Sequence, residues 1–305
     1  MRVAAIDQGT NTTRLLVADV EDGNLSEVVR RSTITRLGEG VDERRRLLPL
    51  PIARVRNSLT DYRREAERLG AERTLLVATS AVRDAENGEA FLGEVEWSYG
   101  FTTKLATGDE EAALMLRGVG EIGRRTVVLD VGGGSTELVT TGFRTSLDIG
   151  SVRLTERYLH SDPPKGYEID ACAARVRGAL PALDVTDGVG VAGTVTSLAA
   201  LDLGLDAYDR ERVDGHRLSL DGVARQLDRL AALPLHERRE VPALEPERAP
   251  VIVAGAVIVR EVMAAYGIDA LRVSERDILD GIAYEAAMLP APVEGDAPPG
   301  AYTCC

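Results

Sequence analysis

Two stretches of this sequence, Ile6–Leu15 (IDQGTNTTRL) and Leu129–Leu138 (LDVGGGSTEL), follow one pattern and decide the fold. Both read apolar, Asp, any residue, Gly, two further residues, Ser or Thr, Thr, any residue, Leu. The two aspartates are 130 − 7 = 123 residues apart, which is a domain length and not the roughly 20–50-residue period of a solenoid. We therefore expect a duplicated fold in which each domain opens with a strand, an Asp-Gly turn and a second strand. In such a fold the two turns can face each other across a cleft.

The surrounding segments alternate between apolar runs and helical periodicity, which is typical of an α/β architecture. After Pro51, apolar residues recur every three or four positions up to Leu69, and Gly70 stands where a helix-terminating glycine belongs. The expected strands are 3–6, 15–17, 75–78, 127–129 and 189–192, and a further helix is expected from about 109 to 119. Another apolar run, Val251–Ala254, enters Gly255 in the same manner as the strand at 189–192 enters Gly193.

Charge and composition exclude several classes of protein. The chain of 305 residues has 36 basic and 49 acidic side chains, a net charge of −13, which argues against coating DNA or an anionic membrane. It has no apolar run of ~18 residues and no leader pattern, so we expect a cytoplasmic protein without a membrane helix. The three cysteines (Cys172, Cys304 and Cys305) form no C-x-x-C pair, which argues against a disulfide framework. Neither lysine, Lys104 or Lys165, lies in a P-loop, so a Walker-type site is excluded.

The two Asp-Gly turns have the chemistry to bind phosphate. Glycine lets the backbone approach an anion and present successive N–H groups to it. The aspartates Asp7 and Asp130 can hold a hydrated divalent cation such as Mg²⁺, which bridges to phosphate oxygens. A single Asp-x-Gly is more often an ordinary tight turn, but the matched pair favours phosphate binding. The predicted phosphate-binding residues of the turns are Gly9, Thr10, Asn11, Thr12, Gly132, Gly133, Gly134, Ser135 and Thr136.

Four other features each allow two interpretations. Arg83, just past a buried strand, can bind phosphate or form a salt bridge with Asp84 or a helix neighbour. Glu110-Glu111 can complement a helix dipole or activate a water molecule. Gly188–Gly193 matches G-x-G-x-x-G, but its middle reads as the strand itself, which favours a phosphate-facing turn at Gly193-Thr194 over a dinucleotide site. Arg44–Arg46 follows two acidic residues, so a solvated mixed-charge loop is favoured over substrate guidance.

Seven segments together resemble the exopolyphosphatase / guanosine pentaphosphate phosphohydrolase family of the sugar kinase–chaperone–actin superfamily. The resemblance extends to about residue 289. The segments are DQGTNT from Asp7, ATSAVRD from Ala78, GDEEA from Gly108, DVGGGSTE from Asp130, GSVRLTE from Gly150, AGTVT from Ala192 and VSE from Val273.

The resemblance implies two ribonuclease-H-like domains, 1–120 and 121–276, in an actin-like ATPase fold with the active site in the cleft between them. A last helix at about 277–289 would pack back on the first domain, and 290–305 would form a Pro/Gly-rich tail. By motif match, Glu111 would be the catalytic glutamate that activates water, assisted by Glu137. Asp130, Gly132, Ser135 and Glu137 would form the second phosphate and metal loop, with Asp7 as a further metal ligand. Asp7, Asn11 and Arg83 would complete the phosphate contacts.

The implied reaction is Mg²⁺-dependent removal of the terminal phosphate of inorganic polyphosphate. The implied cofactors are Mg²⁺ and, as a further candidate, a monovalent cation such as K⁺; a homodimer is a candidate assembly. The sequence departs from the family at Gln8, where an apolar residue or cysteine is usual, and it lacks the C-terminal helical domains of long members. We therefore expect a preference for short polyphosphate.

The motifs leave three alternatives to polyphosphate hydrolysis. The first is the same chemistry on guanosine pentaphosphate, which would imply a role in the stringent response. The second is a kinase of the same superfamily, and the third is a sensor that binds polyphosphate or nucleotide without turnover. Glu111 favours water as the phosphate acceptor and favours turnover over sensing.

Overall fold

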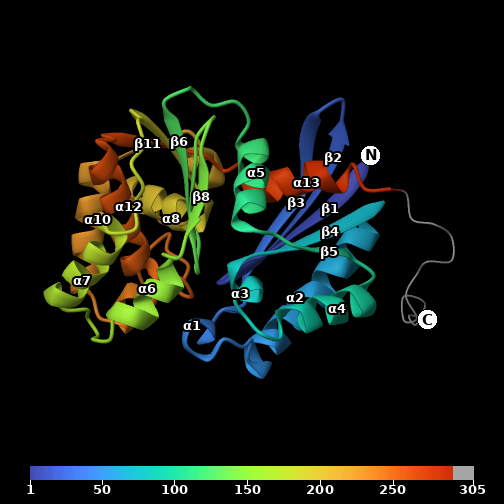
Figure 1. The fold of residues 1–305 in the computed structure, drawn as a ribbon, viewed down its shortest axis with the longest axis horizontal. Coiled ribbons are helices and arrows are strands. Elements are labelled where there is room, and N and C mark those ends of the chain that lie inside the picture. Colours follow the sequence, from blue (N-terminus) through green and yellow to red (C-terminus); the bar gives the residue numbers. More distant parts are fainter. Residues whose placement is uncertain (291–305) are drawn as a thin grey trace. The chain divides into compact units, whose positions relative to one another are not determined.

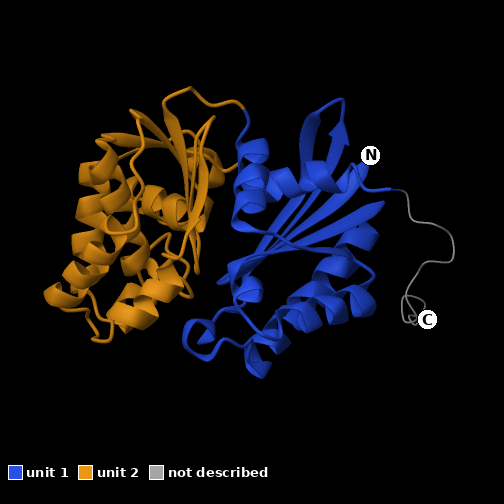
Figure 2. Ribbon diagram, viewed as in Figure 1, with its two compact units in different colours: residues 1–120, 277–305 blue, residues 121–276 orange. Residues whose placement is uncertain are grey.

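The computed structural model describes residues 1–290, which form two compact units (Figures 1 and 2). Unit 1 comprises Met1–Gly120 and the segment that begins at Asp277, and unit 2 comprises Glu121–Arg276. The predictions made for 291–305, including Cys304 and Cys305, lie outside the described residues.

Unit 1 is built on a five-stranded sheet of order β3-β2-β1-β4-β5. The first three strands form an antiparallel meander, while β4 and β5 run parallel to β1. The expected strands at 3–6, 15–17 and 75–78 lie within this sheet. The strands are β1 (Arg2–Gln8), β2 (Thr12–Glu21), β3 (Asn24–Ile34), β4 (Arg73–Ala78) and β5 (Thr102–Leu105).

The helices of unit 1 cover both faces of this sheet (Figure 1). Helix α2 buries the predicted apolar side, including Val55, Leu59 and Tyr62, and it begins at Pro49, where proline costs no hydrogen bond, rather than after Pro51. On the other face, α13 packs against β1, β2 and β4. The helices are α1 (Val41–Arg44), α2 (Pro49–Arg68), α3 (Ser80–Arg83), α4 (Gly88–Tyr99), α5 (Gly108–Val119) and α13 (Ile278–Ala286).

Helices α5 and α13 approach each other through two glycines. A Cβ atom on Gly118 would lie 1.8 Å from the carbonyl oxygen of Asp277, and one on Gly281 would lie 1.9 Å from that of Leu114. Because both neighbours are backbone atoms, neither contact tolerates a side chain. Helix α13, which enters unit 1 only after the whole of unit 2, therefore fixes the position of α5.

Unit 2 repeats the strand arrangement of unit 1. Its six-stranded sheet has the order β10-β11-β9-β6-β7-β8, and the antiparallel meander β6-β7-β8 corresponds to β1-β2-β3. Strand β9 runs parallel to β6, as β4 does to β1. The fold class expected from the repeated sequence is therefore confirmed. The strands are β6 (Thr126–Val131), β7 (Thr136–Val139), β8 (Arg144–Leu147), β9 (Asp187–Val191), β10 (Arg217–Ser219) and β11 (Ala270–Val273).

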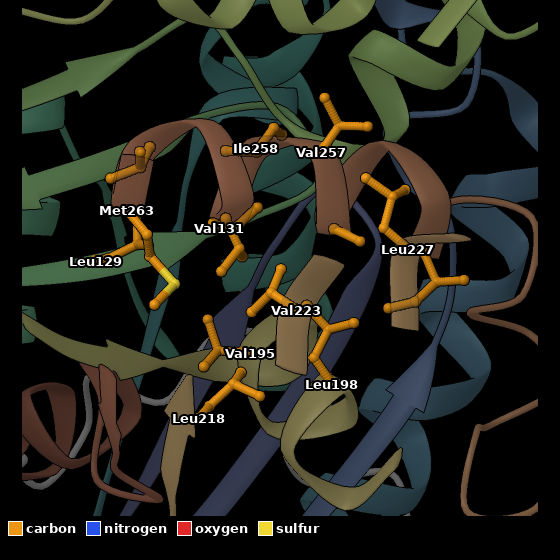
Figure 3. Packing of buried hydrophobic residues seen from close by; sticks show 14 of the residues in the cluster. Leu129, Val131, Val195, Leu198, Leu218, Val223, Leu227, Val257, Ile258 and Met263 are labelled. Carbon is orange, nitrogen blue, oxygen red and sulfur yellow. The ribbon is translucent and has the colours of Figure 1, made fainter. Parts of the chain in front are cut away.

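The core of unit 2 is formed by aliphatic side chains from its sheet and helices, including Leu129, Val195 and Leu227 (Figure 3). Helix α12 lies at its centre and packs against α6, α7, α8 and α10. The helices are α6 (Ser151–Tyr158), α7 (Gly166–Arg177), α8 (Ala192–Asp202), α9 (Arg210–Val213), α10 (Leu220–Ala232), α11 (Leu235–Arg238) and α12 (Ile252–Tyr266).

Two apolar runs in unit 2 form different secondary structures. Val251–Ala254, likened to a strand from its sequence, forms the start of α12, because a helix buried on all sides is as continuously apolar as a buried strand. The run at 189–192 does lie in a strand up to Val191, and Gly188 and Gly190 make room there for Leu271. The G-x-G-x-x-G match is therefore a packing feature of β9.

Between residues 1 and 290, no helix combines the length and the apolar character needed to cross a membrane.

We expect Gly281→Ala to destabilise unit 1, because the new Cβ would overlap the Leu114 carbonyl; overpacking of this kind costs about 1–3 kcal/mol. Thermal denaturation followed by circular dichroism measures the effect. Gly93→Ala in α4, where no atom lies within 4 Å of the new Cβ, is the matched control and should be neutral or stabilising. Equal melting temperatures for the two variants would contradict the proposed close packing.

Candidate active site

The turn between β6 and β7 in unit 2, Gly132–Ser135, is held by its carbonyl groups. The Gly132 amide closes the turn by donating to the Ser135 carbonyl at 3.0 Å. The carbonyls of the three glycines all accept hydrogen bonds from the start of α6. These bonds are Ser151 N to Gly132 O (2.9 Å), Val152 N to Gly133 O (2.8 Å), Arg153 N to Gly133 O (3.1 Å) and Arg153 Nε to Gly134 O (2.7 Å).

This arrangement decides which amides can bind an anion. The amides of Gly133, Gly134 and Ser135 donate to no carbonyl within residues 1–290, whereas the Gly132 amide is used inside the turn. Consecutive N–H groups of this kind form an anion-binding nest. Of the residues expected to bind phosphate, Gly132 therefore uses its amide inside the turn, while Gly133, Gly134 and Ser135 keep amides that an anion can reach.

Gly150 allows α6 to approach the turn. A Cβ atom at this position would lie 2.3 Å from the Gly133 carbonyl oxygen and 2.5 Å from the carbonyl carbons of Gly133 and Gly134. Gly150 and Arg153 were not among the predicted site residues. The sequence signal that contains them is the segment GSVRLTE from Gly150, and the structure shows that its arginine is buried despite its charge.

Two predicted carboxylates of unit 2, Asp130 and Glu137, lie directly opposite each other on β6 and β7. Opposed residues of an antiparallel pair share one face of the sheet, with Cβ atoms about 4.5–5.5 Å apart. Both residues are buried, and Ser146 donates to Glu137 Oε1 at 2.7 Å. One or two carboxylates beside phosphate oxygens are the usual protein ligands of Mg²⁺, so this pair fits that ion. The neighbouring Thr136 hydroxyl donates to the Ile149 carbonyl and so supports the loop.

The corresponding turn in unit 1, Gly9–Thr12, is built in the same way. The Gly9 amide donates to the Thr12 carbonyl at 3.0 Å, and the Thr10 and Asn11 carbonyls accept from the segment that follows β3. Gly38 takes the place of Gly150, since its amide donates to Thr10 O at 2.8 Å and a Cβ there would overlap the Thr10 side chain. Gln8, the departure from the family pattern, is fully buried and accepts from the Thr13 hydroxyl at 2.9 Å.

The two turns differ at one position of the repeat, where unit 1 has Arg14 and unit 2 has Glu137. Arg14 lies opposite Asp7 and pairs with it at 2.7 Å, and its guanidinium also pairs with Asp277. Burial raises the pKa of Asp7, and the charge of Arg14 opposes that shift. A guanidinium thus already neutralises the Asp7 carboxylate, so Asp130 and Glu137 fit a metal ion better than the expected ligand Asp7 does.

Arg83 and Glu111 form an ion pair in unit 1. Arg83, at the end of α3, donates to the Ala106 carbonyl at 2.7 Å and pairs with Glu111 Oε1. Glu111 lies in the first turn of α5 and is only 4% exposed. The salt-bridge interpretation of Arg83 therefore holds, but with Glu111 as the partner.

The neighbouring Glu110 has a different role from Glu111. It forms a capping box with Thr107, and the backbone hydrogen bond from Thr107 lowers the pKa of Glu110. The helix-capping interpretation therefore applies to Glu110, which is half-buried, while Glu111 is buried and paired with Arg83.

Gly193 and Thr194 lie in the first turn of α8 in unit 2. The Thr194 hydroxyl donates to the Val131 carbonyl at 2.8 Å, which joins the start of α8 to the end of β6. A Cβ on Gly193 would lie 2.2 Å from a guanidinium nitrogen of Arg248, so this arginine lies against the glycine. Arg248 was not predicted, because nothing in the local sequence relates it to Gly193.

Within each unit the predicted residues form a connected set. In unit 1 the Thr10 and Ser80 hydroxyls are 2.8 Å apart, which joins the phosphate turn to α3, and α3 joins it to Glu111 through Arg83. In unit 2 the turn, its two flanking carboxylates and the start of α8 surround the end of β6. No cluster of three or more His, Cys, Asp or Glu side chains suited to a metal ion occurs in the described residues. A metal ion here would therefore need oxygen ligands from phosphate or water.

The sequence matches the model of one protein family and is similar to named relatives. The model of the Ppx/GppA phosphatase family matches residues 16–289. The chain is 43% identical to a protein named "Exopolyphosphatase 2" from Mycobacterium tuberculosis, over 94% of this chain and 98% of that protein. It is 30% identical to "Guanosine-5'-triphosphate,3'-diphosphate pyrophosphatase" from Vibrio vulnificus, over 92% of this chain and 58% of that protein.

Solved structures show the same fold. An exopolyphosphatase-like protein superposes with a TM-score of 0.88 and 34% identity, covering 95% of this chain and all of that chain. The Ppx/GppA family member from Aquifex aeolicus superposes with a TM-score of 0.77 and 31% identity, covering 94% of this chain and 98% of that one.

We expect Gly150→Ala to weaken the binding of inorganic pyrophosphate by about 100-fold, because the new Cβ displaces the turn and a shift of about 1 Å has effects of that size. Isothermal calorimetry measures the affinity. Gly142→Ala, in the open β7–β8 turn of the same unit, is the control and should bind as wild type does. Wild-type affinity in a folded Gly150→Ala protein would show that the turn does not bind the anion.

Proposed function

The chain belongs to the Ppx/GppA phosphatase family, and from this premise we propose that it is a Mg²⁺-dependent exopolyphosphatase. It would hydrolyse the terminal phosphoanhydride bond of inorganic polyphosphate with an activated water molecule. The observation that carries the proposal is the set of three outward-facing amides at Gly133–Ser135, flanked by the opposed carboxylates of Asp130 and Glu137. The 43% identity to the mycobacterial protein supports polyphosphate as the substrate.

The first requirement of this reaction is to neutralise the negative oxygens around phosphorus. The amides of Gly133–Ser135 provide fixed donors, and their carbonyl bonds to α6 keep them oriented before the substrate binds. Donors that need no reorganisation stabilise charge in the transition state most effectively.

The second requirement is a divalent cation, and Asp130 and Glu137 are the residues that would hold it. Bound Mg²⁺ would supply positive charge to the phosphate oxygens and reduce the repulsion that a nucleophile meets. The hydrogen bond from Ser146 orients the Glu137 carboxylate on the β6–β7 face.

The third requirement is a group that accepts a proton from water, and we assign this role to Glu111. Arg83 orients its carboxylate by the ion pair at Oε1. As the water oxygen bonds to the terminal phosphorus, its proton passes to Glu111 and the bond to the bridging oxygen breaks. The products are inorganic phosphate and a chain shorter by one phosphate.

Guanosine pentaphosphate is the second candidate substrate, since the Vibrio relative bears the name of that activity. The same three requirements apply to its 5′ phosphate, so the chemistry of Glu111 and of the turn does not separate the two. Among polyphosphates we propose short chains, because a net charge of −13 opposes a long polyanion along the surface.

The proposed function is tested by offering the purified protein and Mg²⁺ short polyphosphate, long polyphosphate, guanosine pentaphosphate and ATP in parallel. Released phosphate should be greatest with short polyphosphate. A phosphorylated product without free phosphate would instead identify a kinase, and binding without turnover would identify a sensor. Faster turnover of long polymer would contradict the proposed preference for short chains.

We expect Glu111→Gln to lower the rate of phosphate release by about 10²–10⁴-fold, the usual contribution of a general base. The Michaelis constant should change little, because the phosphate donors are untouched. Glu110→Gln is the control: glutamine can keep the capping box, so turnover should stay near wild type. Near-wild-type turnover by Glu111→Gln would remove Glu111 from the reaction.

We expect Glu137→Gln to raise the Mg²⁺ concentration for half-maximal activity by roughly tenfold or more, because one of two charged ligands is lost. Removal of Mg²⁺ by a chelator should abolish activity in the wild type. Asp7→Asn leaves Arg14 and its second partner in place and should change the Mg²⁺ requirement by no more than about twofold. A large change in Asp7→Asn with none in Glu137→Gln would reverse the assignment.

A further inference from the structure

Three consecutive arginines, Arg44–Arg46, form what we call the arginine turn, at the end of α1 in unit 1. The turn is fixed to the segment that follows Arg83. The Arg45 carbonyl accepts from the Glu86 amide at 2.8 Å, and the Asn87 side chain makes two hydrogen bonds to the Leu47 backbone. Glu86 and Asn87 follow α3, which carries Arg83 and is labelled in Figure 1.

The segment that leads into the arginine turn is the one that holds the unit 1 phosphate turn. The Gly38 amide donates to the Thr10 carbonyl, and the Thr35 and Arg36 amides donate to the Asn11 carbonyl. One continuous segment, 35–47, therefore contacts the phosphate turn at its start and the neighbourhood of Arg83 at its end. The arginine turn therefore belongs to the segment that supports the unit 1 phosphate turn, and it is itself bonded to the residues that follow Arg83.

The arginine turn carries more positive charge than its neighbours offset, because two carboxylates, Asp42 and Glu43 of the adjoining α1, stand against three arginines. All three side chains are exposed, and no carboxylate lies within ion-pair distance of any of them in the part of the chain that the structure describes. Nearby Arg54, by contrast, pairs with Glu39 at 2.7 Å. The stretch Asp42–Arg46 therefore has a net charge of 3 − 2 = +1 in a chain of net charge −13, which makes it a locally positive site.

The backbone at Arg45 adds a second observation. Arg45 has φ 53° and ψ 29°, the left-handed conformation that ends α1. Glycine or asparagine is favoured there, and other residues are strained. An arginine at this position is therefore less stable than glycine would be, and its side chain makes no ion pair within residues 1–290 that offsets the strain. Strain of this kind concentrates at functional positions.

We propose that the arginine turn binds phosphates of the polyphosphate chain that lie some units away from the terminal phosphate. This inference rests on the proposed function and adds which phosphates of the substrate, beyond the terminal one, the protein binds. Guanidinium groups match phosphate oxygens in pairs, and a linear polyanion that they neutralise releases its condensed counterions. The turn thereby selects chains long enough to reach it, while the acidic remainder of the surface repels the rest of a longer polymer.

The experiment compares two triple variants with the same change of charge. R44Q/R45Q/R46Q removes the arginine turn. R64Q/R68Q/R229Q removes three exposed arginines from α2 and α10 and is the matched control. For each, the Michaelis constant is measured with tripolyphosphate and with chains of roughly 15 phosphates at two salt concentrations.

We expect R44Q/R45Q/R46Q to raise the Michaelis constant for the longer chains about tenfold, with a smaller dependence on salt, and for tripolyphosphate no more than about twofold. The control should show no dependence on chain length. An equal rise at both lengths, or the same rise in the control, would overturn the inference, because either would reflect net charge alone.

A binding measurement separates this inference from the proposed function. Fluorescence anisotropy with end-labelled polyphosphate of roughly 15 units reports binding whether or not the protein hydrolyses it. Weaker binding only in R44Q/R45Q/R46Q supports the arginine turn even if wild type releases no phosphate. Arg45→Gly adds a test that a structural role would fail: we expect a higher melting temperature together with weaker binding. A higher melting temperature with unchanged binding would count against Arg45 as a contact.

Discussion

The hydrogen bonds between the start of α6 and the carbonyls of Gly132–Gly134 are the constraint on which the site depends. A peptide group whose carbonyl is fixed on one side must direct its N–H to the other side, so these bonds determine where the turn can hold an anion. The same constraint explains why residue 150 is a glycine, because a side chain there would overlap the turn. Gly150 permits the approach of α6, and the following residues of the helix supply the donors. The whole β6–β7 turn is therefore organised before any ligand arrives.

The β1–β2 turn of unit 1 is built in the same way as the β6–β7 turn of unit 2, but its electrostatic surroundings differ. The β1–β2 turn has the same closing bond, and Gly38 supports it as Gly150 does in unit 2. At one position of the repeat, unit 1 has Arg14 where unit 2 has Glu137, and this difference changes the charge beside the aspartate of the turn. In unit 2 two carboxylates face one another and favour a cation, while in unit 1 the arginine neutralises Asp7 and ties it to Asp277 at the start of α13. Unit 1 contributes the Arg83–Glu111 pair instead.

Much of this could be predicted from the sequence, because the decisive signals are local. The repeated Asp-Gly pattern predicts the first two strands and the turn of each meander, and the periodicity before Gly70 predicts α2. What could not be predicted depends on contacts between distant residues: Gly281 against Leu114, Gly150 against Gly133, and the pairing of Arg83 with Glu111. The strand prediction for Val251–Ala254 was wrong for a different reason. A segment buried on all sides is apolar throughout and therefore has no periodicity that distinguishes a helix from a strand.

The central claim is that the amides of Gly133, Gly134 and Ser135 bind the phosphate, and amide NMR tests it most directly. Wild-type protein labelled with ¹⁵N and ²H would be titrated with inorganic pyrophosphate in the presence of Mg²⁺. A hydrogen bond to an anion moves an amide proton downfield, so these three resonances should shift most, while Gly132, already bonded to Ser135, should shift least. Saturable binding that leaves the three resonances unmoved would contradict the account.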